Sequence, residues 1–239
     1  RGPGGGWSGP RPRGRDGAGT HVMVWTHGLA LSEPVLATTL RERAHDPLFQ
    51  SGSVRVEGTD VLGFVYKAAA EIGELGDNVR VLRKAVHGDA LLRRALAQPG
   101  ARVSVLGHTR WASVGIISEP NCHPVNSEQS EQSYTEQAEH AGGGQSASPY
   151  AVAVLNGDVD NHADVKVNHG LRIAGPITTD AKVIPAVMAL HAAKGADLAE
   201  AFRRTVAEFE GSRCTSASAT TCSSSPASPT GWWRRPPAT

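Results

Sequence analysis

The apolar side chains of this chain recur with two different periods. Short stretches in which apolar residues alternate with polar ones, or follow one another directly, are typical of strands. This pattern predicts strands at residues 21–26, 54–57, 102–107 and 151–155. The last two lead directly into polar motifs, one beginning at His108 and the other at Asn156. Because strand ends often carry functional groups, both motifs are candidate sites.

Helical spacing appears in three other regions. Val79, Leu82 and Val86 share one helix face, and Asp89 is placed to cap a second helix through residues 91–96. Residues 181–193 form a predicted helix that tolerates Pro185 in its first turn, where the missing N–H needs no intrahelical partner. A capping box of Asp197 and Glu200 starts the last predicted helix, whose apolar face continues to Phe209.

Three segments lack the side chains that build a core. Residues 1–12 are rich in Gly, Pro and Arg, and we expect a disordered or abnormal terminus in preference to an RNA-binding arm. Residues 126–149 are predicted to be a mobile loop. Residues 212–239 contain no Leu, Ile, Val, Asp or Glu, so we expect no helix or strand in this low-complexity tail. A natural tail and a coding sequence read out of frame both explain it. The folded domain is predicted at residues 13–211.

Composition restricts the partners. The 24 Lys and Arg nearly balance the 23 Asp and Glu, so the basic surface expected for nucleic acid or an anionic membrane is not predicted. The apolar runs are shorter than a membrane span, and a cytoplasmic protein is expected. Three cysteines, Cys122, Cys214 and Cys222, form no C-x-x-C pair, which argues against a disulfide framework or a zinc site.

Each polar group at a strand end has an ordinary structural explanation. Arg110 beside Trp111 is typical of a stacked surface pair, Asn156-Gly157 of a hairpin turn, and Asp180 of a helix cap. Their order along the chain is more informative than any one of them. The motifs are H-T-R-W-A-S-V-G at 108–115, S-E-P-N-C-H-P at 118–124, L-N-G-D-V-D-N-H at 155–162 and T-D-A-K at 179–182.

In this order the motifs resemble the glutaminase domain of glucosamine-6-phosphate synthases, a branch of the class II glutamine amidotransferases, which have an N-terminal nucleophile. The family motifs read H-T-R-W-A-T-H-G, S-E-x-N-A-H-P, H-N-G-I-I-E-N-H and T-D-T-E. The resemblance is clearest at residues 102–211, and the family's R-G-x-D-S-A-G is matched by residues 13–19 with Gly17 in place of Ser. It implies an α+β fold, a four-layer α-β-β-α sandwich of the N-terminal nucleophile hydrolase type, incomplete at its N-terminus.

The resemblance also implies a substrate and the residues that bind it. Arg110 would bind the α-carboxylate of L-glutamine through its guanidinium, and Asp180 would accept hydrogen bonds from the α-ammonium group. Trp111 would cover the site, and Ser113 keeps the hydroxyl of the family threonine. No metal or organic cofactor is implied.

The catalytic groups implied by the family are only partly present. Asn156, through its side chain, and Gly157, through its N–H, would form the oxyanion hole that stabilises the tetrahedral intermediate. The family nucleophile is a cysteine at the mature N-terminus, whose own amine acts as the base. Residue 1 here is Arg1, and Cys122 stands where the family has alanine, so a buried structural thiol is expected there. The sequence therefore predicts a domain that is inactive as written.

Three of the departures within the matched motifs replace an ionisable residue of the family by one of different charge or chemistry. Val114 and Leu155 stand where the family has histidines, and Lys182 replaces a glutamate. They are expected to alter affinity or specificity without removing the groups that would bind the substrate.

Three functions remain open at this point. The first is the ammonia-releasing part of a glucosamine-6-phosphate synthase, which in full length carries sugar-phosphate isomerase domains as partners. The second is a glutamine-binding or regulatory module without a nucleophile. The third is another class II amidotransferase, similar to amidophosphoribosyltransferase or asparagine synthase.

Overall fold

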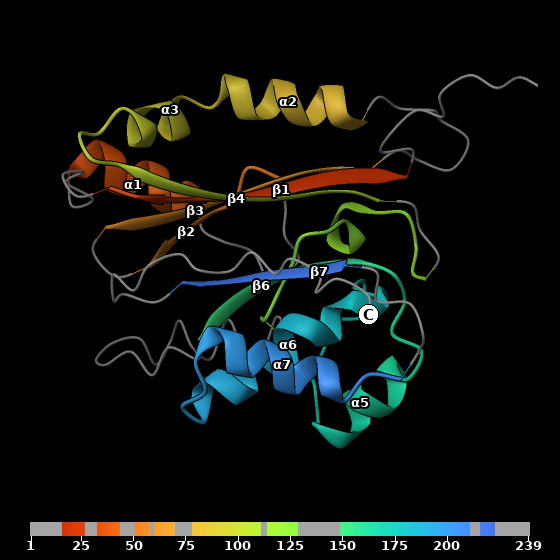
Figure 1. Cartoon of the computed structure of the whole chain (residues 1–239). Coiled ribbons are helices and arrows are strands. Elements are labelled where there is room, and N and C mark those ends of the chain that lie inside the picture. Colours follow the sequence, from red (N-terminus) through yellow and green to blue (C-terminus); the bar gives the residue numbers. More distant parts are fainter. Residues whose placement is uncertain are drawn as a thin grey trace, which may run out of the picture.

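The computed structural model describes residues 16–26, 33–43, 51–57, 60–69, 78–110, 114–128 and 149–210, together with the backbone of residues 216–222. The described elements are arranged as helix, sheet, sheet and helix layers (Figure 1). Both sheets are antiparallel, so the chain has a mixed fold compatible with the predicted α+β class. Within these residues no helix has the length and apolar character needed to cross a membrane.

The larger sheet has the strand order β2-β3-β1-β4. Its central strand β1 is buried along nearly its whole length and pairs with β4 so that Gly17 lies opposite Arg110. This register brings the end of β4 to the start of β1, next to the segment that follows β4. The strands are β1 (Gly17–Trp25), β2 (Val54–Glu57), β3 (Val61–Ala68) and β4 (Arg102–Arg110).

Three helices cover one face of this sheet and enclose an apolar core. Alternate residues of β1, Val22 and Val24, face this core, as do Phe64 and Tyr66 of β3. Asp89 caps α3 as predicted, because its side chain accepts hydrogen bonds from the N–H groups of residues 91 and 92. The helices are α1 (Pro34–Glu42), α2 (Asn78–Gly88) and α3 (Ala90–Leu96).

The smaller sheet has the order β5-β6-β7, with β5 at Val125–Asn126, β6 at Tyr150–Asn156 and β7 at Ser216–Cys222. β7 corrects the expectation that residues 212–239 contain no strand. A strand depends on backbone hydrogen bonds to its neighbour, and β7 pairs along all of β6 with small residues such as Ser, Ala and Thr. This segment lacks aliphatic side chains, but a strand at the edge of a sheet does not require them.

The fourth layer packs on the other face of the smaller sheet. Its core joins apolar residues of β6 to α6, whose side chains from Val183 to Ala189 are buried. Pro185 lies in the first turn of α6 as predicted, and Asp197 accepts a hydrogen bond from the Glu200 N–H at 2.8 Å to start α7. The elements are α5 (His162–Asn168), the short 3-10 helix η2 (Asp180–Lys182), α6 (Val183–Ala193) and α7 (Leu198–Ala207).

All four predicted strands and all the predicted helices are present, while α1, β3 and α5 were not predicted. β3 is apolar at most positions and buried on both faces, so it shows no alternation that would distinguish it from a buried helix. The predicted terminal segment 1–12 and residues 129–148 of the predicted mobile loop lie outside the described residues.

Candidate functional site

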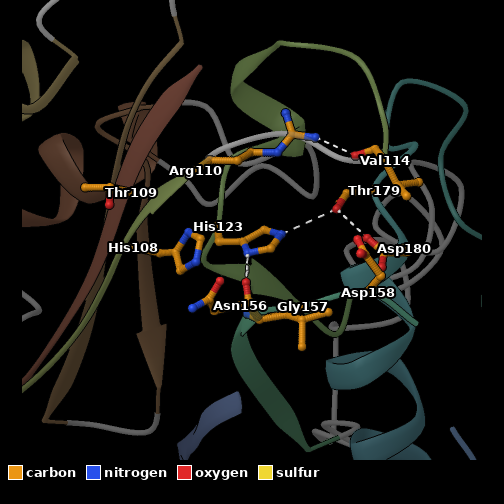
Figure 2. Close-up of a pocket in the computed structure, with 11 residues that line it drawn as sticks. His108, Thr109, Arg110, Val114, His123, Asn156, Gly157, Asp158, Thr179 and Asp180 are labelled. Carbon is orange, nitrogen blue, oxygen red and sulfur yellow. Dashed lines mark hydrogen bonds between the residues drawn. The ribbon is translucent and has the colours of Figure 1, made fainter. Parts of the chain in front are cut away.

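The ends of β4 and β6 meet at a cavity of about 230 Å³ that lies between the two halves of the fold (Figure 2). Four residues predicted from the motifs line it together, namely Arg110, Asn156, Gly157 and Asp180. The other two predicted residues, Trp111 and Ser113, lie outside the described residues. The remaining lining residues are His108, Thr109, Val114, His123, Leu155, Asp158 and Thr179.

Arg110 is the last residue of β4 and is only 4% exposed. Its Nη1 donates to the Ile116 carbonyl at 3.0 Å, and its Nη2 donates to the carbonyls of Val114 at 2.6 Å and Gly115 at 3.3 Å. Burial lowers the pKa of Arg110, although Asp180 and other anions nearby oppose this shift. Within the described residues no carboxylate lies at ion-pair distance from this guanidinium. A buried cation whose hydrogen bonds go to neutral carbonyl groups keeps its full charge and favours an anionic ligand.

The loop that follows β4 reaches the cavity because residue 115 is glycine. Gly115 has a φ of 87°, a backbone conformation that other residues rarely adopt. A Cβ atom at this position would lie 2.9 Å from the Thr179 backbone nitrogen. The loop therefore packs directly against the residue before Asp180, which brings the surroundings of Arg110 and Asp180 into contact.

Asp180 begins η2 and is 4% exposed. Its Oδ2 accepts a hydrogen bond from the Val159 N–H at 2.7 Å, and its Oδ1 lies 3.4 Å from the Thr179 hydroxyl. The fully buried Asn121 holds the preceding turn, because its Oδ1 accepts from the N–H groups of Thr178 at 2.7 Å and Thr179 at 2.8 Å. The carboxylate is thus fixed by the loop after β6 and by the 118–124 segment.

The oxyanion-hole candidates lie at the end of β6. Asn156 is the last, exposed residue of the strand, and Gly157 follows with a φ of 150°, which favours glycine. His123 holds this turn in place. Its Nδ1 lies 3.1 Å from the Leu155 carbonyl oxygen, and its Nε2 lies 3.4 Å from the Thr179 hydroxyl. His123 therefore links the Asn156 turn to the Asp180 turn.

Two imidazoles lie between Arg110 and Asn156 (Figure 2). The rings of His108 and His123 are 4.7 Å apart. Burial, reinforced by the neighbouring His108 and by the cations Lys67 and Arg110, lowers the pKa of His123 to about 3. Burial and the neighbouring Arg110 also lower the pKa of His108. Both rings are therefore neutral at pH 7 and add no positive charge to the cavity.

The three departures from the family motifs take up different positions. The Leu155 side chain is 2% exposed and belongs to the core beneath β6. Lys182 is also fully buried, and its Nζ donates to the backbone carbonyl and side-chain oxygen of Asn126 at 2.8 and 2.9 Å. Val114 and Leu155 both line the cavity, and of these two only Val114 lies outside the core clusters. Lys182 therefore links η2 to β5 and does not face the cavity.

Cys122 is buried as expected and is 0% exposed. Burial raises the pKa of its thiol against the opposing effect of Lys67, so the reactive thiolate is disfavoured. The positioning role of Asn121 and the place of Asp158 in the cavity were not predicted. Asn121 and His123 lie within the motif at 118–124, but only their hydrogen bonds to distant residues show which segments they hold.

Among the described residues, no group of His, Cys, Asp and Glu side chains is arranged to hold a metal ion.

Comparisons with known proteins support a glutamine amidotransferase-like domain in this chain. The chain is 28% identical over 159 residues to the glutamine--fructose-6-phosphate aminotransferase (isomerizing) of Bacillus cereus strain ATCC 10987, covering 66% of this chain and 23% of the relative. The enzyme of the same name from Geobacillus kaustophilus is 31% identical over 120 residues, 50% of this chain and 17% of the relative. That from Xanthomonas campestris pv. campestris is 32% identical over 117 residues, 48% of this chain and 15% of the relative.

These matches confirm the predicted resemblance to glutamine--fructose-6-phosphate aminotransferases. The chain spans 23% or less of the length of the relatives named here. No protein-family model matches the chain.

Proposed function

We propose that residues 13–211, with β7 completing the smaller sheet, form the glutamine-binding, glutaminase-type domain of a protein related to glutamine--fructose-6-phosphate aminotransferase. The observation that carries this proposal is that a buried guanidinium, that of Arg110, and a buried carboxylate, that of Asp180, line the same small cavity. An α-amino acid carries a carboxylate and an ammonium group on the same carbon, so it presents the complementary charges. The order of the four layers supports a sandwich of the N-terminal nucleophile hydrolase type.

The same cavity suits the reaction of an amide side chain. With the amino-acid head between Arg110 and Asp180, the side-chain amide of glutamine would extend toward Asn156 and Gly157. Donors at this position stabilise the oxyanion of a tetrahedral intermediate, and one such donor contributes about 3 kcal/mol to acyl transfer. The ammonia released would serve amino-sugar synthesis in the cytoplasm, through sugar-phosphate isomerase domains in a full-length protein.

Hydrolysis also requires a nucleophile beside the oxyanion hole. Cys122 is the cysteine whose side chain the structure describes, and its buried, protonated thiol does not line the cavity. We therefore propose that the polypeptide printed here binds glutamine without hydrolysing it. The second candidate function is therefore a glutamine-binding module without a nucleophile. It differs from the glutaminase domain only in that it does not hydrolyse the bound glutamine.

Isothermal titration calorimetry with L-glutamine tests the binding proposal. Arg110→Met and Asp180→Asn are each expected to weaken binding at least tenfold, because each removes the partner of one charge on the ligand. Arg172→Met and Asp164→Asn remove exposed charges away from the cavity and are the matched controls. Unchanged affinity in both cavity variants, or no glutamine binding by the parent chain, contradicts the proposal.

A second measurement separates binding from hydrolysis. The chain is incubated with L-glutamine and ammonia release is followed, while a glutamine-derived electrophile is used to alkylate any reactive thiol. We expect neither ammonia nor a labelled cysteine in this polypeptide. Ammonia release that is abolished by Asn156→Ala would instead establish an active glutaminase.

A further inference from the structure

His123 contacts both ends of the cavity through its imidazole. Counted from the paired residues Val125 and Ala153, it falls opposite Leu155, two residues before β5 begins. Its Nδ1 contacts both polar groups of the Leu155 backbone, because it lies 3.1 Å from the carbonyl oxygen and accepts from the N–H at 3.4 Å. On the other side of the ring, Nε2 lies 3.4 Å from the Thr179 hydroxyl.

These contacts require more hydrogen atoms than the groups possess. A neutral imidazole carries one N–H, so Nδ1 can donate to the Leu155 carbonyl or accept from the Leu155 N–H, but not both. Thr179 has a single hydroxyl hydrogen for two acceptors, Nε2 of His123 and, at 3.4 Å, Oδ1 of Asp180 (Figure 2). Because burial lowers the pKa of His123 to about 3, the ring is neutral at pH 7 and has two alternative tautomers.

Each tautomer has its own set of partners. In the Nδ1–H tautomer, the ring donates to the Leu155 carbonyl and the Thr179 hydroxyl donates to Nε2. In the Nε2–H tautomer, the ring donates to the Thr179 oxygen, whose hydroxyl donates to the Asp180 carboxylate, and Nδ1 accepts from the Leu155 N–H. The number of protons is the same in both, because the ring loses one N–H hydrogen to water and gains another from water at its other nitrogen. The short carbonyl contact favours the first tautomer, and the charged acceptor Asp180 favours the second.

We propose that His123 is a positioning residue whose tautomer couples the Asp180 end of the cavity to the Asn156 turn. For its ligand, an amino acid with a free α-ammonium group, this coupling rests on the proposed glutamine-binding function. When the ammonium group binds Asp180, its N–H groups satisfy the carboxylate, and the Thr179 hydrogen becomes available to Nε2. His123 then changes to the Nδ1–H tautomer and donates to the Leu155 carbonyl.

This change reaches the oxyanion-hole candidates through one peptide group. The Leu155 carbonyl belongs to the planar peptide that joins Leu155 to Asn156, so a hydrogen bond to it fixes the orientation of that plane. A ligand with an α-ammonium group therefore orders the turn that would stabilise its own tetrahedral intermediate. A simple amide lacks the ammonium group and does not induce the change.

NMR spectroscopy of the chain labelled with ¹⁵N-histidine tests this coupling, because two-bond ¹H–¹⁵N correlations show which imidazole nitrogen carries the hydrogen. The signals of His123 are identified by their loss in His123→Gln. Asp180→Asn replaces the charged acceptor by a neutral one, so in the ligand-free variant we expect the ratio of the Nδ1–H to the Nε2–H tautomer to rise about fivefold. Asp164→Asn removes an exposed carboxylate away from the cavity and should leave the ratio unchanged.

L-glutamine should raise the same ratio in the parent chain at concentrations that calorimetry shows to be saturating. Thr179→Val removes the shared hydroxyl and should abolish this response. Thr179→Ser keeps the hydroxyl, so it should keep the response and is the matched control. Circular dichroism verifies that each variant is folded like the parent.

The outcomes separate this coupling from the proposed function. An unchanged tautomer ratio in ligand-free Asp180→Asn overturns the coupling, regardless of what the chain binds. An unchanged ratio in a parent chain saturated with L-glutamine also overturns it, and leaves the proposed function intact. If the parent chain does not bind L-glutamine while Asp180→Asn shifts the ratio, the proposed function fails and the link between Asp180 and His123 is retained.

Discussion

Two departures from the family motifs occupy the same space, which leads to a double-mutant prediction. Gly17 stands where the family has serine, and Cys122 stands where it has alanine. A Cβ atom built on Gly17 would lie 2.3 Å from the Cys122 Sγ and 3.3 Å from the Ala68 carbonyl oxygen. The thiol therefore fills the volume that a side chain at position 17 would need, and each departure compensates for the other.

The expected energies follow from this contact. Ordinary van der Waals contact begins at 3.4 Å, so Gly17→Ser forces a shift of more than an ångström in a fully buried region. Overpacking of this kind costs about 1–3 kcal/mol. Cys122→Ala alone removes one buried sulfur and costs about 1 kcal/mol. In the double variant the added side chain occupies the vacated space, so its stability should lie within about 1 kcal/mol of the parent.

Urea unfolding followed by circular dichroism measures these free energies. The double-mutant cycle is expected to give a favourable coupling of about 2 kcal/mol between positions 17 and 122. Gly88→Ser combined with Cys122→Ala is the control, because a Cβ atom at Gly88 meets no atom within 4 Å and the two changes should be additive. Additive effects for Gly17→Ser and Cys122→Ala would refute the compensation.

Two predictions concern the stability of the fold. Burial lowers the pKa of Lys67 and of Lys182 from 10.5 to about 7. Between these two pH values the folded chain therefore binds fewer protons than the unfolded chain. The free energy of unfolding should rise from pH 7 to pH 10 as a result. Urea titrations should show a smaller rise in Lys67→Met and Lys182→Met, but not in the exposed control Lys84→Met, and an unchanged rise in both would contradict the assigned pKa values. Asp89 accepts hydrogen bonds from Arg43 at 2.6 Å, from the Tyr66 hydroxyl and from the first N–H groups of α3. Asp89→Ala should lower the free energy of unfolding by about 3 kcal/mol, because it removes a helix cap and leaves the partly buried Arg43 without its ion-pair partner. A loss below about 1 kcal/mol in urea unfolding would refute this.

The larger elements could be predicted because local patterns suffice for them. Asp89 and Asp197 marked helix starts through side-chain caps that involve only neighbouring residues. β4 and β6 were recognised by apolar runs that stop at polar motifs. β3 and β7 escaped because their evidence is not local: β3 is buried on both faces by distant segments, and β7 is held by its pairing with β6.

The site divides in the same way. The sequence by itself determined which chemical groups are present and in what order, so Arg110, Asn156, Gly157 and Asp180 could be named in advance. Only the tertiary structure decided their surroundings: that Lys182 turns away from the cavity to bind Asn126, and that His123 links the Asn156 turn to the Asp180 turn. The physical reason is that burial, charge balance and close contact depend on segments far apart in the chain. The sequence determines which ionisable side chains are present. The free energy of ionising each of them depends on the groups that the fold packs around it.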